Sequence, residues 1–187
     1  MATQTFYKAL MASENVLSFL GSTKYQAESE FAEIHDGALV TLAGLAKNDA
    51  YNIGDVENIL DDNVFLSAAP AAATDPVVIV DIAGVSNGII AGNNYKIGIK
   101  LTGLKAEPGV AVRYRRLVKG DMFWLSDGCF ASTPTVGQFA TATASSTLHT
   151  PAAADPANGS YCVKILDSRD LTVGSKSAGT LYLCQVQ

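Results

Sequence analysis

The sequence is poor in the residues that enzymes use as acids, bases and nucleophiles. Among 187 residues there are only two histidines, His35 and His149. A hydrolytic triad needs a histidine held beside a nucleophile and a carboxylate, and the chain contains no GxSxG nucleophile elbow. His35 falls in a predicted turn and His149 in a segment rich in threonine and alanine, so both are expected to be ordinary surface histidines. The sequence predicts a protein that is not an enzyme.

Motifs for cofactors and small-molecule substrates are also missing. There is no GxxxxGKS/T phosphate loop, and residues 84–92 lack the GxGxxG spacing of a dinucleotide site. The acidic stretch at residues 48–63 supplies hard oxygen ligands, but their spacing does not match a calcium-binding loop, which favours a solvated acidic loop. We therefore expect no cofactor, no metal ion and no small-molecule substrate.

The chain has three cysteines and no CxxC motif. An odd number cannot pair fully within one chain, and each one lies in or beside an apolar run: Cys129, Cys162 and Cys184. Isolated cysteines also give no zinc ligand set. Buried, reduced thiols are expected, and they are typical of a protein assembled in a reducing cytoplasm.

Charge and long apolar runs are scarce as well. Only 17% of residues are charged and the formal net charge is −5, which disfavours a nucleic-acid partner. The basic cluster Arg113, Arg115 and Arg116 lies within a strand pattern, which favours a salt-bridged or interface face. No apolar run approaches the roughly 18 residues that span a membrane, and no basic segment precedes an apolar core at the N-terminus. We expect a protein without a membrane partner or secretory signal.

Residues 1–24 differ from the rest of the chain in their residue pattern and are expected to form an N-terminal arm or short helix. Apolar residues recur at roughly helical spacing, beginning with Phe6, Tyr7 and Leu10. Ser13 could cap a short helix that ends near Gly21. Such a helix is too short to stand alone in water, so it docks either on this chain's core or on a neighbouring subunit.

Residues 25–187 are expected to form one β domain. Residues 25–32 alternate like an extended segment, and the turn His35-Asp36-Gly37 follows. Residues 110–130 predict two strands around a Lys119-Gly120-Asp121 turn, the second of which, residues 122–125, is apolar on both faces. Further strands are predicted at 38–45, 77–81, 95–102, 161–166 and 181–186. With frequent turns and no long helical period, the fold class is mainly β, a single sandwich or barrel-like domain.

Several segments together resemble small structural proteins of tailed bacteriophages. They are EIHDGALVTLAGL, APAAATDPVVIVDIAGVSNG, NNYKIGIKLTGLKAEPGVAVRYRRLVKGDMFWLSDGCF and PTVGQFA. The resemblance covers most of the chain from about Phe31 onward and is densest from Val77 to Ala140. The family comprises head decoration, cement and other capsid-associated proteins, and it supplies no catalytic residues to carry over.

The resemblance implies a virion protein, assembled in the bacterial host cytoplasm, that binds the major capsid protein on the outside of the shell, often as a trimer. Its candidate contacts are the arm residues Phe6, Tyr7 and Leu10 and the arginines Arg113, Arg115 and Arg116. Two alternatives stay open: another virion part, such as a tail-tube or shell subunit, and a β-sandwich that binds carbohydrate or a host receptor. The second would use exposed aromatic residues, with Tyr51, Tyr95 and Trp124 as candidates.

Overall fold

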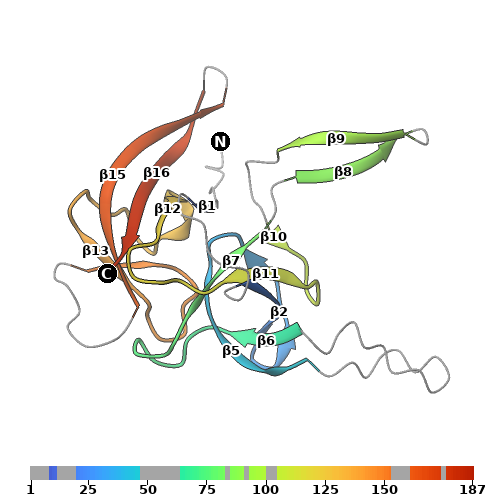
Figure 1. Ribbon diagram of the computed structural model, residues 1–187, viewed down its shortest axis with the longest axis horizontal. Coiled ribbons are helices and arrows are strands. Elements are labelled where there is room, and N and C mark those ends of the chain that lie inside the picture. Colours follow the sequence, from blue (N-terminus) through green and yellow to red (C-terminus); the bar gives the residue numbers. More distant parts are fainter. Residues whose placement is uncertain are drawn as a thin grey trace.

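The fold is mainly β, as the sequence predicts, and combines a closed barrel with a six-stranded sheet (Figure 1). The computed structural model describes residues 9–11, 20–46, 64–82, 85–90, 93–99, 105–152, 161–173 and 176–187. Within these ranges no helix has the length and apolar character needed to cross a membrane.

Five strands close the barrel, in the order β11-β7-β5-β6-β2, with β11 pairing back onto β2. They are β2 (Leu20–Ala27), β5 (Leu39–Leu45), β6 (Val64–Ala68), β7 (Val78–Asp81) and β11 (Val112–Arg115). All neighbours are antiparallel except β2 and β6, which run parallel with Ser22 opposite Val64. β-Branched residues alternate into the interior, where Val40, Val80 and Val112 pack around Tyr114. Closure leaves the barrel without unpaired edges along these strands.

The second part is an antiparallel sheet in the order β1-β12-β16-β15-β13-β14. Its strands are β1 (Ala9–Met11), β12 (Met122–Ser126), β13 (Phe139–Thr141), β14 (Thr150–Ala152), β15 (Cys162–Val173) and β16 (Lys176–Val186). A short 3₁₀ turn, η3 (Asp127–Cys129), follows β12. One face of the sheet is fully buried and carries Phe123, Leu125, Val163, Ile165 and Cys184.

The barrel packs directly against this buried face. Ile79 lies on the barrel strand β7, yet it belongs to the sheet's core cluster and is fully buried there. Backbone hydrogen bonds cross the same junction, from Leu39 N to Thr147 O at 2.8 Å and from Ser145 N to Pro70 O at 2.7 Å. The two parts therefore pack against each other through β7 and are linked by these backbone hydrogen bonds.

Residues 110–130 contain the two predicted strands, but these strands enter different parts of the fold. β11 belongs to the barrel and β12 to the six-stranded sheet. The turn between them is present: Asp121 Oδ2 accepts from Val118 N at 2.9 Å, and Gly120 takes a φ of 94°. The segment thus links the two parts instead of forming a hairpin.

The expected domain boundary needs correction, whereas most of the expected N-terminal helix falls outside the described residues. Residues 12–19, which would contain the helix, lie outside the described residues, but Ala9–Met11 is the strand β1 and not helix. A boundary after residue 24 would cut β2, a continuous barrel strand. Gly21 is part of β2 opposite Tyr114, whose ring occupies the space where a Cβ would lie, at 2.4 Å. The glycine is needed for close packing and does not end a helix.

The segment from Tyr25 to Ala32 is also not continuously extended. β2 ends at Ala27, and Glu28 and Ser29 both take positive φ values, 51° and 72°. The chain then reverses into β3 (Glu30–Phe31), with Ala27 opposite Glu30. Two consecutive left-handed residues make the tight turn that antiparallel hairpins favour. Next, β4 (Ile34–His35) pairs with β10 (Lys105–Ala106), and the predicted turn at Gly37 has a φ of 79°.

Two ribbons extend from this body (Figure 1). The first is the outer part of β15 and β16, which continues to Val173 and Lys176, beyond the residues that pair with β12 and β13. The second is formed by β8 (Val85–Ile90) and β9 (Asn93–Ile99), which pair with each other as a separate two-stranded sheet. Two-stranded ribbons without a further strand are marginally stable in water.

Candidate functional site

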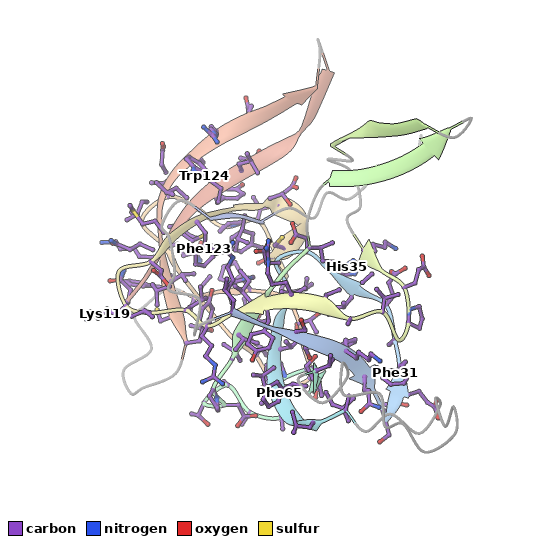
Figure 2. The ribbon with its side chains drawn as sticks, turned by 45° about the vertical axis from the view of Figure 1, so that its right-hand side comes forward. Phe31, His35, Phe65, Lys119, Phe123 and Trp124 are labelled. Atoms are coloured by element: carbon purple, nitrogen blue, oxygen red, sulfur yellow. The ribbon has the colours of Figure 1, made fainter. Side chains whose placement is uncertain are left out.

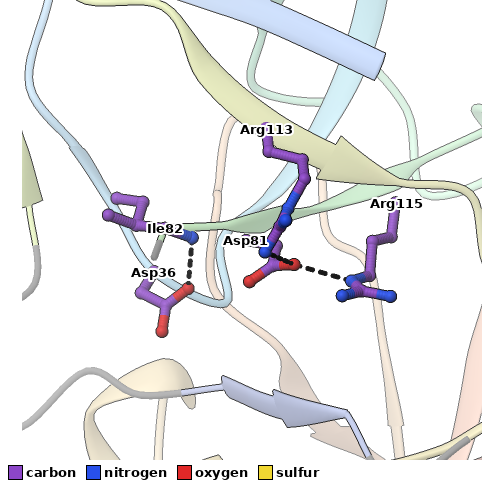
Figure 3. A network of polar contacts seen from close by, with 5 residues as sticks. All are labelled: Asp36, Asp81, Ile82, Arg113 and Arg115. Carbon is purple, nitrogen blue, oxygen red and sulfur yellow. Dashed lines mark hydrogen bonds and ion pairs between the residues drawn. The ribbon is translucent and has the colours of Figure 1, made fainter. Parts of the chain in front are cut away.

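The predicted arginine cluster is divided by the structure. Arg113 and Arg115 project from the outer face of β11, because Val112 and Tyr114 alternate with them into the barrel core. Both guanidinium groups converge on Asp81 of the neighbouring strand β7 (Figure 3). The distances to Asp81 Oδ2 are 2.7 Å from Arg113 Nη2 and 2.6 Å from Arg115 Nε. The expectation of a salt-bridged face is confirmed for these two residues.

We call Asp81 and the two arginines that it binds, Arg113 and Arg115, the Asp81 cluster. It presents a surplus of positive charge at the barrel surface. Two guanidinium groups share one carboxylate, and the Arg113 side chain remains 46% exposed while that of Arg115 is only 18% exposed. Beside them, the buried carboxylate of Asp36 accepts a hydrogen bond from Ile82 N at 2.8 Å, which fixes the end of β7 (Figure 3). Arg113 is therefore the member best placed to contact a partner, and Arg115 is largely structural.

Arg116 lies apart from this pair. It is exposed and follows the last residue of β11, where its side chain lines a groove with Leu42, Val78 and Leu117. The three basic residues therefore lie on two different surfaces.

Of the predicted arm residues, Phe6 and Tyr7 lie outside the described residues. Leu10 lies in β1, where its backbone is opposite Trp124.

His149 is not the surface residue that the sequence predicts. It is fully buried at the junction of barrel and sheet, with Nε2 at 3.0 Å from Gly37 O and Nδ1 at 3.0 Å from the Tyr161 hydroxyl. Since a carbonyl oxygen can only accept, Nε2 carries the proton and Nδ1 accepts from Tyr161. Burial lowers the pKa of His149 to about 4 and raises the pKa of Tyr161 well above its usual range. The imidazole is thus a neutral connector between the two parts.

No sequence pattern near His149 predicts this connector. The surrounding residues are small and polar, and the residues that it contacts are 12 and 112 positions away in the chain. The ring also packs against Phe130, with ring centroids 5.6 Å apart. His35, in contrast, is half-buried in β4, and burial together with the nearby Lys105 lowers its pKa.

All three cysteines are free and buried, as predicted. Cys129 Sγ donates to Asp36 O at 3.5 Å, so the thiol also contributes to the junction. Burial, followed by the nearby Cys129, raises the pKa of Cys184. Within the described ranges, no group of three or more histidine, cysteine, aspartate or glutamate side chains could hold a metal ion.

Of the three aromatic candidates for carbohydrate binding, Trp124 is the one whose side chain the structure describes. Phe123 is fully buried, as expected, whereas its neighbour Trp124 is half-buried on the other face of β12 (Figure 2). The Arg169 guanidinium lies over the Trp124 ring, 4.1 Å from its centroid. The cation therefore covers one π face of the ring, which is then not open to a stacking sugar. Tyr51 lies outside the described residues, and of Tyr95 only the backbone, in β9, is described.

The described architecture defines a mainly β protein whose closed barrel packs on a six-stranded sheet. Comparisons of the chain with protein-family models, curated proteins and solved structures find no match.

Proposed function

We propose that the protein is a non-enzymatic virion protein of a tailed bacteriophage that decorates the head shell and stabilises it. The observation that carries the proposal is the resemblance of its segments, above all Val77 to Ala140, to capsid-associated phage proteins. In this role each copy bridges neighbouring major capsid subunits. Expansion or rupture of the shell must then break additional interface area, which raises the free energy needed to disrupt it.

Features of the described surface support a binding role. Among the described strands, the outer parts of β15 and β16 pair only with each other, and such edges can add to the sheet of another chain. Large apolar side chains are exposed, including Leu45, Val110 and Val136. The Asp81 cluster adds a cationic patch with Arg113 at its outer side, and arginine is enriched in protein interfaces. The proposed partners are the major capsid protein and further copies of this chain, as a trimer.

The projecting ribbon also favours a second candidate, a tail-tube or shell subunit. Among the described strands, the outer part of this ribbon pairs with no third strand, and such an edge can template pairing with a further copy of the chain. Light scattering after size-exclusion chromatography separates the two candidates. A small closed oligomer is expected of a decoration protein, whereas rings or tubes that form without capsids would favour the alternative.

Cosedimentation with empty and expanded capsids tests the proposal itself. The purified protein is expected to bind expanded shells, and Arg113→Glu is expected to weaken that binding by about fivefold, since a rim charge pair is worth roughly 1 kcal/mol. Lys105→Glu is the matched control, because Lys105 is also an exposed cation that pairs with a carboxylate, that of Glu33 at 2.7 Å. Absence of binding to either shell, with retention on a glycan array, would overturn the decoration role.

A further inference from the structure

The guanidinium groups of Arg113 and Arg115 use only part of their hydrogen-bonding capacity. Arg113 Nη2 and Arg115 Nε both contact the same oxygen, Asp81 Oδ2, at 2.7 Å and 2.6 Å (Figure 3). Within the described part of the chain, neither arginine forms an ion pair with a carboxylate other than Asp81. Each guanidinium group carries further N–H donors in the same plane. The donors that Asp81 does not use are available to water or to a ligand.

The shared carboxylate leaves the Asp81 cluster with an uncompensated positive charge. Two cations and one anion give a formal charge of +1. If Arg113 and Asp81 formed a pair without Arg115, they would neutralise each other. Because Arg115 also binds Asp81, from a largely covered position, the exposed Arg113 keeps part of its charge free. Arg115 is therefore a positioning residue, which acts on a ligand of Arg113 through Asp81.

The strands hold the Asp81 cluster in place. Val112 and Tyr114, on either side of Arg113, are buried in the barrel core. Arg113 lies between its register partners, Asp81 on β7 and Ser22 on β2. Since all three strands belong to the closed barrel, a ligand of Arg113 binds to a site that is already ordered.

The geometry of the free donors and the charge of the cluster define the ligand. An arginine fork binds carboxylates and phosphates through two parallel hydrogen bonds. A carboxylate carries one negative charge and matches the surplus of +1, whereas a phosphate group carries roughly −1.5 to −2 and exceeds it. The buried Asp36 carboxylate, beside Asp81, opposes any further negative charge (Figure 3). The Asp81 cluster therefore favours a carboxylate.

We propose that the Asp81 cluster binds one carboxylate, that of an acidic side chain on a partner protein. Arg113 projects from the outer face of β11, where a protein surface can reach it and can supply the additional contacts that a small free carboxylate lacks. The identity of the partner rests on the proposed function, which makes it the major capsid protein. The binding of a carboxylate does not depend on that role and is measured without capsids.

Titration of the purified protein with sodium acetate, at an ionic strength held constant with sodium chloride, tests the site by NMR. The Nε–H signal of Arg113 is expected to shift and to saturate. Arg169, an exposed arginine whose guanidinium lies over the Trp124 ring, is the internal control and is expected to keep its signal. Inorganic phosphate is expected to need a higher concentration for half-saturation. Absence of a saturable shift, an equal shift of Arg169, or tighter binding of phosphate would overturn the proposal.

Three variants separate the roles of the two arginines, with binding followed through the backbone amides of β11. Arg113→Lys keeps the charge but lacks the fork, and is expected to raise the half-saturating acetate concentration about fivefold. Arg115→Gln leaves Asp81 to Arg113 alone and is expected to abolish saturable binding, whereas Arg115→Lys restores the charge and is expected to recover it. Melting temperatures show whether each variant is folded. Wild-type affinity in Arg113→Lys, or in a folded Arg115→Gln, would contradict the proposed site.

Expanded shells identify the source of the carboxylate. Shells treated with carbodiimide and glycinamide, which convert exposed carboxylates into neutral amides, are expected to bind the wild-type protein about fivefold less than mock-treated shells. Arg113→Gln is expected to bind both kinds of shell equally. If acetate binds but amidation leaves shell binding unchanged, the major capsid protein is not the partner and that part of the proposal is wrong. If acetate binds and no shell does, the proposed function fails while the carboxylate site stands.

Discussion

His149 donates a hydrogen bond to the carbonyl oxygen of Gly37 and accepts one from Tyr161, each at 3.0 Å. Gly37 belongs to the turn before the barrel strand β5, and Tyr161 stands immediately before the sheet strand β15. A single buried imidazole therefore joins the two parts of the fold. Because both of its nitrogens are satisfied only in the neutral form, the stability of the junction depends on the protonation of this one residue.

Removing the imidazole is expected to destabilise the protein strongly. His149→Phe keeps the packing against Phe130 but leaves the Gly37 carbonyl and the Tyr161 hydroxyl without their partner, which costs about 2–3 kcal/mol of unfolding free energy. Urea unfolding followed by tryptophan fluorescence measures it. Tyr161→Phe, which removes only one hydroxyl, is expected to cost about 1 kcal/mol. Equal stability of wild type and His149→Phe would contradict the role of the histidine.

Stability is expected to fall with acid between about pH 6.5 and pH 4. The pKa of His149 is lowered from 6.5 to about 4 by burial, so the unfolded chain binds the extra proton first. Its contribution is complete above pH 6.5 and is lost as pH falls through the folded pKa. A shift of about 2.5 units at about 1.36 kcal/mol each amounts to about 3 kcal/mol. The free energy of unfolding, measured with urea at pH 7, 5.5 and 4.5, should decrease more with falling pH for wild type than for His149→Phe.

Gly21 and Gly44 are expected to respond differently to the same substitution. A Cβ at Gly21 would lie 2.4 Å from the Tyr114 ring, whereas nothing lies within 4 Å of one at Gly44. Gly21→Ala should therefore lower the unfolding free energy by about 1–3 kcal/mol through overpacking. Gly44→Ala should change it by less than about 0.5 kcal/mol. Thermal unfolding of the two variants gives the comparison, and equal melting temperatures would contradict the close contact in β2.

The three thiols are expected to be unreactive in the folded protein. Cys129, Cys162 and Cys184 are buried, and the pKa of Cys184 is raised by burial, so little thiolate is available. A thiol-reactive chromogenic disulfide should label none of them under native conditions at pH 8 and all three in denaturant. Rapid labelling of a folded sample would contradict this expectation, because it requires the buried thiols to become exposed on the timescale of the reaction.

Sequence patterns located strands in both parts of the fold, among them β5, β7, β11, β12, β15 and β16, because alternation of apolar and polar residues depends on local burial. The clearest case is the alternation along β11. Its apolar residues, Val112 and Tyr114, lie inside the barrel, and its charged residues, Arg113 and Arg115, lie outside. The buried, free cysteines follow from their apolar surroundings in the same way. These features depend on near neighbours in the chain.

Features that depend on distant contacts were not predicted. The strands on either side of Gly120 look like a hairpin, and only pairing with β7 and β16 shows that they separate. Gly21 looks like a helix end, because the Tyr114 ring that requires it lies in another strand. His149 looks exposed, because its partners come from both parts of the fold. No sequence pattern predicts that Asp81 binds two arginines, because only the pairing of β7 with β11 brings them together.

Strand order also has a consequence for synthesis on the ribosome. The barrel closes only when β11, ending at Arg115, pairs with β2 near the start of the chain. The sheet cannot assemble until β16, ending at Val186, has emerged, because β16 lies between β12 and β15. Pairings this distant in sequence fold slowly, since long loops must close before the contacts form. The barrel can therefore close first in the nascent chain, whereas β12 and β15 each keep an unpaired edge until β16 has emerged.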